Sequence, residues 1–120
     1  MNSNLLGCYA EYKFAVEAMK NGFSVSMPLL NTSPYDAILE KNYKLYKFQI
    51  KSISQKRFNE NDKSIHVNLR HQGYYTLDEV DYFAILYDNG FFVIPNKLQK
   101  SFSLSLNGVY KKYFNNFVLN

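Results

Sequence analysis

The chain has 120 residues, enough for one domain with a single hydrophobic core but not for two. Apolar residues make up 47% and aromatic residues 18%, which excludes an intrinsically disordered chain. The net charge of +4 permits a nucleic-acid partner without requiring one, and the lone cysteine, Cys8, excludes an internal disulfide or a cysteine-based zinc site. No apolar run approaches the roughly 18 residues of a membrane span, and the N-terminus has no signal-peptide pattern. We therefore expect a cytoplasmic protein without a membrane partner.

The first predicted element is a helix from about Asn4 to Lys20. Asn2, Ser3 or Asn4 can cap its start, and Asn21-Gly22 supplies the usual stop signal. Short runs of β-type residues follow, separated by turn signals. The predicted strands are Phe23–Met27, Tyr35–Glu40, Tyr43–Ile53, Ser64–Leu69, Val80–Tyr87 and Phe91–Pro95.

The connections between these strands and the C-terminal tail complete the predicted fold. Asp88-Asn89-Gly90 is a strong hairpin signal, and the charged, amide-rich segment Gln55–Lys63 predicts an exposed loop. The tail predicts a short strand from Ser101 and then an aromatic helix over Asn107–Leu119. No repeat or linker divides the chain, so we expect one domain over residues 1–120 with an α+β (α/β) fold.

An acidic residue lies on the apolar side of the predicted helix. At 100° per residue, Lys13, Glu17 and Lys20 share one arc that should face water, whereas Glu11 lies roughly 150° away. A carboxylate on a buried stripe is costly unless a cation or a hydrogen-bond donor meets it. Two interpretations remain open for Glu11: a structural salt bridge, or a metal ligand or catalytic carboxylate.

The third predicted strand alternates polar and apolar residues. Lys47, Gln49 and Lys51 point to one side of it, because side chains alternate with period two. Asp36, near the start of the preceding strand, falls opposite Gln49 if a four-residue loop joins the strands, or opposite Lys47 if the turn has two residues. Such a polar face is most often simply solvated. The nearby Glu11 favours a functional site instead.

These side chains suit a metal-assisted phosphodiester hydrolase. The oxygens of Asp36, Glu11 and the Gln49 amide are hard donors, which Mg²⁺ prefers and zinc does not. Lys51 can orient an attacking water or stabilise the charge that develops on a phosphate. The sequence contains no glycine-rich phosphate loop and no Ser/His/Asp or Cys/His nucleophile set.

Three short motifs contain these residues. They are Gly7-x-x-x-Glu11 in the first helix, Pro34-Tyr35-Asp36 at the second strand and Gln49-Ile50-Lys51 in the third. Together with Val80–Ile85 and Phe92–Pro95, they resemble the PD-(D/E)XK nucleases over about residues 7–95. The resemblance implies a restriction-endonuclease-like core over about residues 5–95, in which an N-terminal helix packs on a mixed, largely antiparallel central sheet. Residues 96–120 then form a strand and helix extension.

The resemblance also implies a role for each site residue. Asp36 is the principal metal ligand, Glu11 an assisting acid and Gln49 a further ligand, while the backbone carbonyl of Ile50 also contributes and Lys51 is the catalytic lysine. The implied cofactor is Mg²⁺, for which Mn²⁺ can substitute. Gln49 replaces the family's usual acid, which should weaken metal binding. This departure is similar to the small group I intron homing endonucleases of the superfamily, which use Gln-x-Lys and assemble as tetramers.

Basic and amide residues beside the site are expected to contact DNA. Arg and Gln can read base edges, while Lys mostly meets phosphate. The predicted contacts lie on or just after the third strand and in the loop after the next one: Lys47, Ser52, Ser54, Gln55, Lys56, Arg57, Arg70, His71 and Gln72. Taken singly, each is also typical of an ordinary solvated residue.

The resemblance implies a Mg²⁺-dependent DNA endonuclease that hydrolyses phosphodiester bonds, of the intron-homing type that makes double-strand breaks. One active site cuts one strand, so we expect a homo-oligomer, a dimer or a tetramer, acting on double-stranded DNA. Two alternatives stay open. One is a structure-selective nuclease like the Holliday-junction resolvases, and the other is a catalytically silent DNA-binding module, which the neutral Gln49 motivates.

Overall fold

The N-terminal helix forms as predicted. The computed structural model describes residues 1–53, 58–59 and 64–120. Helix α1 spans Ser3–Lys20, and its N-cap Asn2 accepts a hydrogen bond from the Leu5 N–H at 2.8 Å. The chain leaves the helix at Gly22, whose φ of 88° is the left-handed conformation that favours glycine. In these parts of the chain, no helix has both the length and the apolar character that crossing a bilayer requires.

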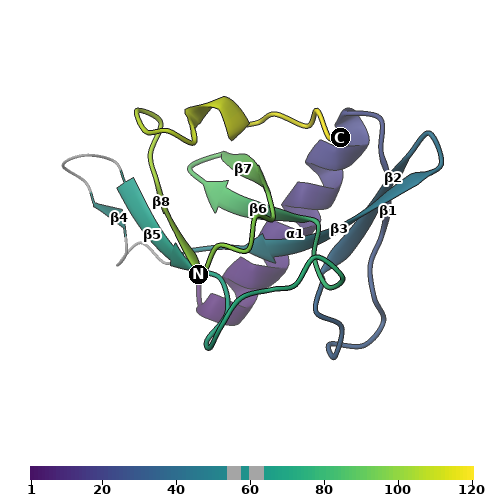
Figure 1. Ribbon diagram of the computed structural model, residues 1–120, viewed down its shortest axis with the longest axis horizontal. Coiled ribbons are helices and arrows are strands. Elements are labelled where there is room, and N and C mark those ends of the chain that lie inside the picture. Colours follow the sequence, from purple (N-terminus) through teal and green to yellow (C-terminus); the bar gives the residue numbers. More distant parts are fainter. Residues whose placement is uncertain (54–57, 60–63) are drawn as a thin grey trace.

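A five-stranded mixed sheet forms the centre of the molecule (Figure 1). Its strands, in spatial order, are β1 (Ser24–Ser26), β2 (Ala37–Lys41), β3 (Lys44–Lys51), β6 (Tyr82–Tyr87) and β7 (Gly90–Pro95). Strands β3 and β6 run parallel, and the other neighbouring pairs are antiparallel. The predicted mixed, largely antiparallel sheet under an N-terminal helix is therefore confirmed.

The turn between β2 and β3 sets the register on which the site depends. It consists of Asn42 and Tyr43, with φ values of 54° and 65°, as in a type I′ hairpin turn. This turn is shorter than the four-residue loop considered from the sequence. The strand register is nevertheless the one that the four-residue loop predicts. Glu40 pairs with Leu45, and Lys41 with Lys44 forms one additional pair next to the turn. Asp36 lies one residue before β2, opposite Gln49.

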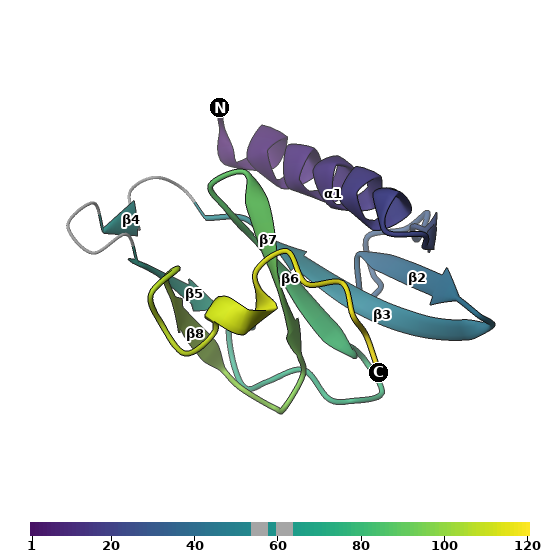
Figure 2. The ribbon, with the colours of Figure 1, turned by 90° about the horizontal axis from the view of Figure 1, so that it is seen from above.

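A second, three-stranded sheet contains β4 (Phe58–Asn59), β5 (Ser64–Asn68) and β8 (Ser101–Leu104), in the order β4-β5-β8. Strand β4 falls inside Gln55–Lys63, which the sequence predicted to be a loop. That prediction is wrong at these two residues, because their backbone pairs with the edge of β5. Figure 2 shows α1 on one side of the central sheet and β5 with β8 on the other.

Two hydrophobic clusters lie on the opposite faces of the central sheet. On the helix side, the ring of Phe14 lies 4.9 Å from that of Phe48 and 5.4 Å from that of Phe91, measured between centroids. On the other side, the ring of Phe83 lies 5.8 Å from that of Phe102. Because Phe48 of β3 faces the helix, its neighbours Lys47 and Gln49 point to the opposite face of the central sheet.

The C-terminal tail differs from the prediction. The expected helix over Asn107–Leu119 is wrong: the structure has only a 3₁₀ turn, η2 (Lys111–Tyr113), between irregular segments. Asn, Phe, Tyr and Gly are poor helix formers, and Asn115 is left-handed with a φ of 53°. The tail instead pairs with β7, since the Asn115 N–H donates to the Phe91 carbonyl at 2.7 Å and its side-chain oxygen accepts from the Phe91 N–H at 2.9 Å.

This docking of the tail predicts opposite effects for two glycine substitutions. A Cβ added at Gly90 would collide with the Asn115 side chain and lie 2.7 Å from Cζ of the Phe114 ring, whereas one added at Gly7 in α1 meets nothing within 4 Å. We expect Gly90→Ala to lower the free energy of unfolding by about 1–3 kcal/mol. Gly7→Ala should raise it by about 0.5–1 kcal/mol. Urea unfolding followed by circular dichroism measures both, and a Gly90→Ala variant as stable as wild type would contradict the described packing.

Candidate functional site

Asp36 is held where the chain enters β2. Its carboxylate oxygen Oδ2 accepts two hydrogen bonds from β3, one from the backbone N–H of Ile50 at 2.8 Å and one from Nε2 of Gln49 at 2.7 Å. Its own N–H donates to the Phe48 carbonyl at 2.7 Å. The half-buried carboxylate is therefore fixed against the strand that carries Gln49 and Lys51. The predicted juxtaposition of a carboxylate and a carboxamide is confirmed.

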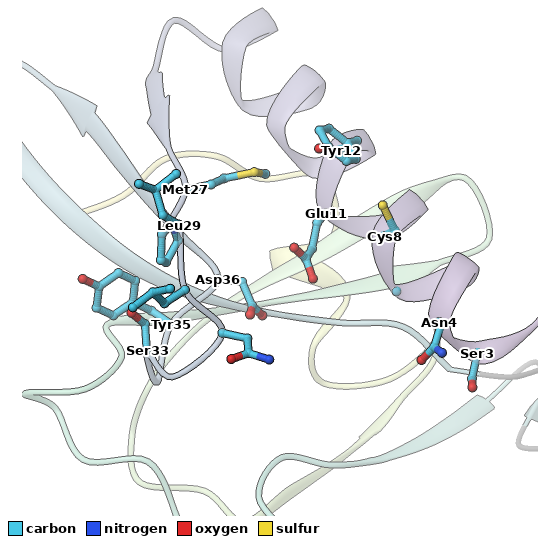
Figure 3. A pocket seen from close by; sticks show the side chains of 14 residues that line it. Ser3, Asn4, Cys8, Glu11, Tyr12, Met27, Leu29, Ser33, Tyr35 and Asp36 are labelled. Atoms are coloured by element: carbon cyan, nitrogen blue, oxygen red, sulfur yellow. The ribbon is translucent and has the colours of Figure 1, made fainter.

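Glu11 approaches Asp36 from the opposite element, α1. Figure 3 shows the two carboxylates pointing toward each other across a groove. The pKa of Glu11 is raised above its usual value by burial and then by the neighbouring charge of Asp36. The two ion pairs of the described residues are Lys20–Glu17 and Arg70–Glu79. The structural salt bridge that was one interpretation of Glu11 is thus not found in this part of the chain.

The groove between α1 and the β1–β2 loop has a volume of about 580 Å³. Its lining includes Glu11, Asp36 and residues that were not among the predicted site residues: Tyr12 and Cys8 of α1, and Met27, Leu29, Leu30 and Tyr35 of the loop. Leu29 and Leu30 are exposed on its wall. In the sequence, this wall is indicated only by the fact that the loop that forms it leads directly into Asp36.

Lys51 supplies the positive charge beside these carboxylates. Burial lowers the pKa of Lys51, and the charge of Asp36 partly opposes that effect. The pKa of Asp36 is raised by burial, although the Ile50 N–H and the charge of Lys51 pull it back. Asp36 therefore links the three ionisable groups, which come from a helix, a loop and a strand, because its charge affects the pKa values of both Glu11 and Lys51 in a partly desolvated place.

The donor set fits a hard divalent cation. Two carboxylates with raised pKa values face one another, and carboxylate oxygens are the ligands that Mg²⁺ prefers. The described residues contain no group of three or more His, Cys, Asp or Glu side chains that could hold a metal ion, so a third ligand from this part of the chain would be an amide, hydroxyl or backbone carbonyl oxygen. The Gln49 amide is placed for that role, although it turns its nitrogen toward Asp36 here. A ligand role for the Ile50 carbonyl stays a prediction.

The predicted DNA contacts lie in several places. Ser54, Gln55, Lys56 and Arg57 lie outside the described residues. Ser52 directly follows β3 and is half-buried, and His71 and Gln72 are exposed in the loop after β5. A further groove of about 320 Å³ is lined by Asn68, Arg70, His71, Gly73, Lys100 and Ser101.

Two of the basic residues predicted to contact DNA already have protein partners. The Arg70 guanidinium makes two hydrogen bonds to Glu79, at 2.8 and 3.2 Å, and lies 4.6 Å from the centre of the Tyr75 ring. The Lys47 ammonium donates to the carbonyl of Asp78. The Lys47 N–H also donates to the Asp81 carboxylate at 2.8 Å, so Asp81 braces the sheet.

Comparison with known proteins decides the family. The family model described as PD-(D/E)XK endonuclease matches residues 1–112. The chain belongs to the PD-(D/E)XK endonuclease family. No curated protein matches the chain. Among solved structures, a bacterial homing endonuclease, I-Ssp6803I, matches with a TM-score of 0.77 and 19% sequence identity, covering 95% of this chain and 89% of that one.

These findings confirm the family and the fold predicted from the sequence. In the PD-(D/E)XK fold of this chain, the three motifs lie on α1, at the entry to β2 and on β3, as the resemblance implied. Membership of an endonuclease family supports a nuclease, and a nuclease implies a nucleic-acid substrate.

The electrostatics of the site predict that Glu11→Gln stabilises the protein. A raised pKa means that Glu11 contributes stability only below its unfolded-state pKa, and this contribution is lost as the pH rises through the folded-state pKa. At neutral pH we expect Glu11→Gln to raise the free energy of unfolding by up to about 1 kcal/mol, limited by solvent screening.

Urea unfolding at several pH values measures the effect. The gain should shrink toward zero as the pH falls below the unfolded-state pKa of glutamate. The matched control on the same helix is Glu17→Gln, whose wild-type side chain pairs at 3.5 Å with the exposed Lys20 and should change stability by less than about 0.5 kcal/mol. Equal effects of the two substitutions at every pH would contradict the assigned electrostatics.

Proposed function

We propose that this chain is a DNA endonuclease that depends on a divalent metal ion, with Mg²⁺ as the natural ion and Mn²⁺ as a substitute. The observation that carries the proposal is the meeting of Glu11, Asp36 and Lys51 from three separate segments, with Gln49 bonded to Asp36. A purely structural role does not explain why two partly buried carboxylates, both with raised pKa values, face each other.

Each side chain has a role in this proposal. Asp36 is the principal ligand, because β3 fixes its carboxylate through two hydrogen bonds. Glu11 would complete the carboxylate pair from the helix side, and Gln49 would offer its amide oxygen as a further ligand. A bound ion of this kind polarises a phosphate and activates water. The chain's own contribution is to hold these donors in a fixed geometry before substrate arrives.

Lys51 is the proposed catalytic lysine. Its ammonium group lies in the field of Asp36, where it can orient the attacking water and stabilise the negative charge that develops on the phosphate. Burial lowers the pKa of Lys51, so the group loses its charge at a lower pH than an exposed lysine does. Cleavage therefore requires a pH at which Asp36 is ionised and Lys51 is still charged, and burial moves the pKa values of these two groups toward each other.

The homing type of endonuclease is proposed on the likeness to a bacterial homing endonuclease, whose fold covers 95% of this chain. The Gln-x-Lys motif at Gln49 and Lys51 supports the same choice. A double-strand break requires one catalytic centre for each strand, so the proposal includes a homo-oligomer on double-stranded DNA. Ser52, His71 and Gln72 are proposed DNA contacts, and Lys47 and Arg70 can join them if DNA competes for their present partners.

Two substitutions test the proposed function. Asp36→Asn and Lys51→Ala should reduce nicking of a supercoiled plasmid that carries the chain's own coding locus by at least about 100-fold, since each removes a charge used in the reaction. Matched controls are Asp88→Asn in the β6–β7 turn and Lys44→Ala at the far end of β3, both exposed, and both should cut like wild type. Circular dichroism checks that every variant folds. Normal cleavage by either site variant would overturn the assigned roles.

A silent DNA-binding module is the second candidate, because the Gln49 amide already satisfies Asp36 without any ion. Gln49→Glu separates the two candidates. Without metal, a third carboxylate against Asp36 should lower the melting temperature. With Mg²⁺, the variant should bind the ion about tenfold more tightly than wild type, an increase of about 1.4 kcal/mol that appears as a larger stabilisation.

The readouts are thermal melts over a Mg²⁺ titration together with plasmid cleavage, and Gln99→Glu outside the site serves as the control. Cleavage by wild type identifies an active enzyme. Cleavage by Gln49→Glu alone identifies a silent module that the restored acid reactivates. If Mg²⁺ stabilises neither protein, the metal site is not where we place it.

A further inference from the structure

Helix α1 exposes five large apolar side chains in one row. They are Leu5, Tyr9, Tyr12, Val16 and Met19, whose exposed fractions are 56%, 42%, 64%, 48% and 55%. We call these five residues the apolar stripe. Scattered exposed hydrophobic residues are normal on a protein surface, but a contiguous row of them marks an interaction site.

The spacing of the apolar stripe is that of a helix-packing seam. Its residues follow one another at intervals of four, three, four and three, which keeps them on one side of a helix. The opposite side of α1 buries Ala10, Phe14 and Ala18 in the core. The helix is therefore apolar on two opposite sides, whereas a surface helix of a globular protein normally has one apolar face, which it buries. Figure 2 shows α1 as an outer layer, with the other elements on one side of it.

We infer that the apolar stripe is the surface on which a second copy of this chain packs, helix against helix. The area supports a stable contact. Five side chains of this size that are about half exposed offer on the order of 100 Å² each. Two copies would then bury about 1,000 Å² from the apolar stripe alone, which is the area that a specific interface needs.

The apolar stripe is complementary to itself. In an antiparallel, two-fold arrangement centred on Tyr12, Leu5 of one copy faces Met19 of the other, Tyr9 lies within one residue of facing Val16, and the two Tyr12 side chains meet at the axis. Tyr and Met are also residues that interfaces favour. The charged residues Lys13, Glu17 and Lys20 lie beside the apolar stripe, as charges do at the rim of a contact.

A lipid surface is a poorer match for the same row. Helices that lie on membranes carry many Lys and Arg residues along their polar face. In α1 the basic residues are Lys13 and Lys20, and they are balanced by Glu11 and Glu17. The helix thus lacks the net positive charge that attracts an anionic bilayer.

The choice of a second copy as the occupant rests on the proposed function, because two strands need two catalytic centres. The geometry agrees with it, since Tyr12 belongs both to the apolar stripe and to the lining of the groove that holds Glu11 and Asp36. Pairing through α1 places the two grooves on either side of one contact. Both centres can then act on the same duplex.

Sedimentation equilibrium of the full chain tests the interface without any nuclease assay. Wild type should have a mass that is an even multiple of 14.1 kDa. The double variant Tyr9→Glu/Val16→Glu should have half that mass or less, because charges cannot be buried in an apolar contact. The matched control Val109→Glu/Val118→Glu adds the same charge at residues that are 84% and 83% exposed, and it should keep the wild-type mass. A milder pair, Tyr9→Ser/Val16→Thr, replaces the test variant if circular dichroism shows that the glutamates unfold it.

Three results would overturn the inference. They are a monomeric wild type, an unchanged mass in both folded stripe variants, and wild type that floats with phosphatidylglycerol vesicles while the stripe variant does not. Plasmid cleavage is measured in parallel. We expect wild type to linearise a supercoiled plasmid and the stripe variant to accumulate the nicked form. If no protein cuts DNA but the masses change as expected, the proposed function fails and the interface stands.

Discussion

The contact between Asp36 and β3 holds the candidate site together. One carboxylate oxygen accepts both the Ile50 N–H and the Gln49 amide, and these bonds tie the entry of β2 to the strand that carries Lys51. A shift of one residue in the β2–β3 register would turn Gln49 and Lys51 to the other face and remove both partners from Asp36. The Asn42-Tyr43 turn, which sets that register, is therefore part of the functional site although it lies at the far end of the hairpin.

Much of this arrangement could be predicted, because it depends on local chemistry. The cap and stop signals placed α1 within one residue, and the alternation along β3 put Gln49 and Lys51 on the same face. Predicting that Asp36 lies opposite Gln49 required only the alternation of side chains along a strand and an assumed length for the connecting loop. The meeting of Glu11 with Asp36 was harder to predict, since it depends on how α1 packs across the sheet. The helical wheel showed only that Glu11 faces inward.

Features that arise from long-range packing were missed. The tail was predicted to be an aromatic helix, yet its backbone pairs with β7 instead. Asn96 shows the same limit. Its buried side chain donates to the carbonyls of Tyr75, Thr76 and Val80 and so anchors the loop that leads into β6. One asparagine after a strand carries no signal of this role. The apolar stripe on α1 was equally hidden, because both sides of the helix are apolar and only the structure shows which side is covered.

The neutral residue at position 49 also has a physical consequence for the fold. Burial already raises the pKa values of Glu11 and Asp36, and the charge of Asp36 raises that of Glu11 further, so a third acid beside them would add repulsion at this helix–sheet contact. Gln49 instead donates a hydrogen bond to Asp36, which offsets part of the cost of burying that carboxylate. The glutamine thus exchanges metal affinity for stability in the absence of metal. The lower repulsion matters for the position of α1, because this helix carries Glu11 on its inner side and the apolar stripe on its outer side. Added repulsion between Glu11 and the sheet would displace α1 and, with it, the apolar stripe. The proposed pairing of two copies therefore depends on a stable contact between Glu11 and Asp36.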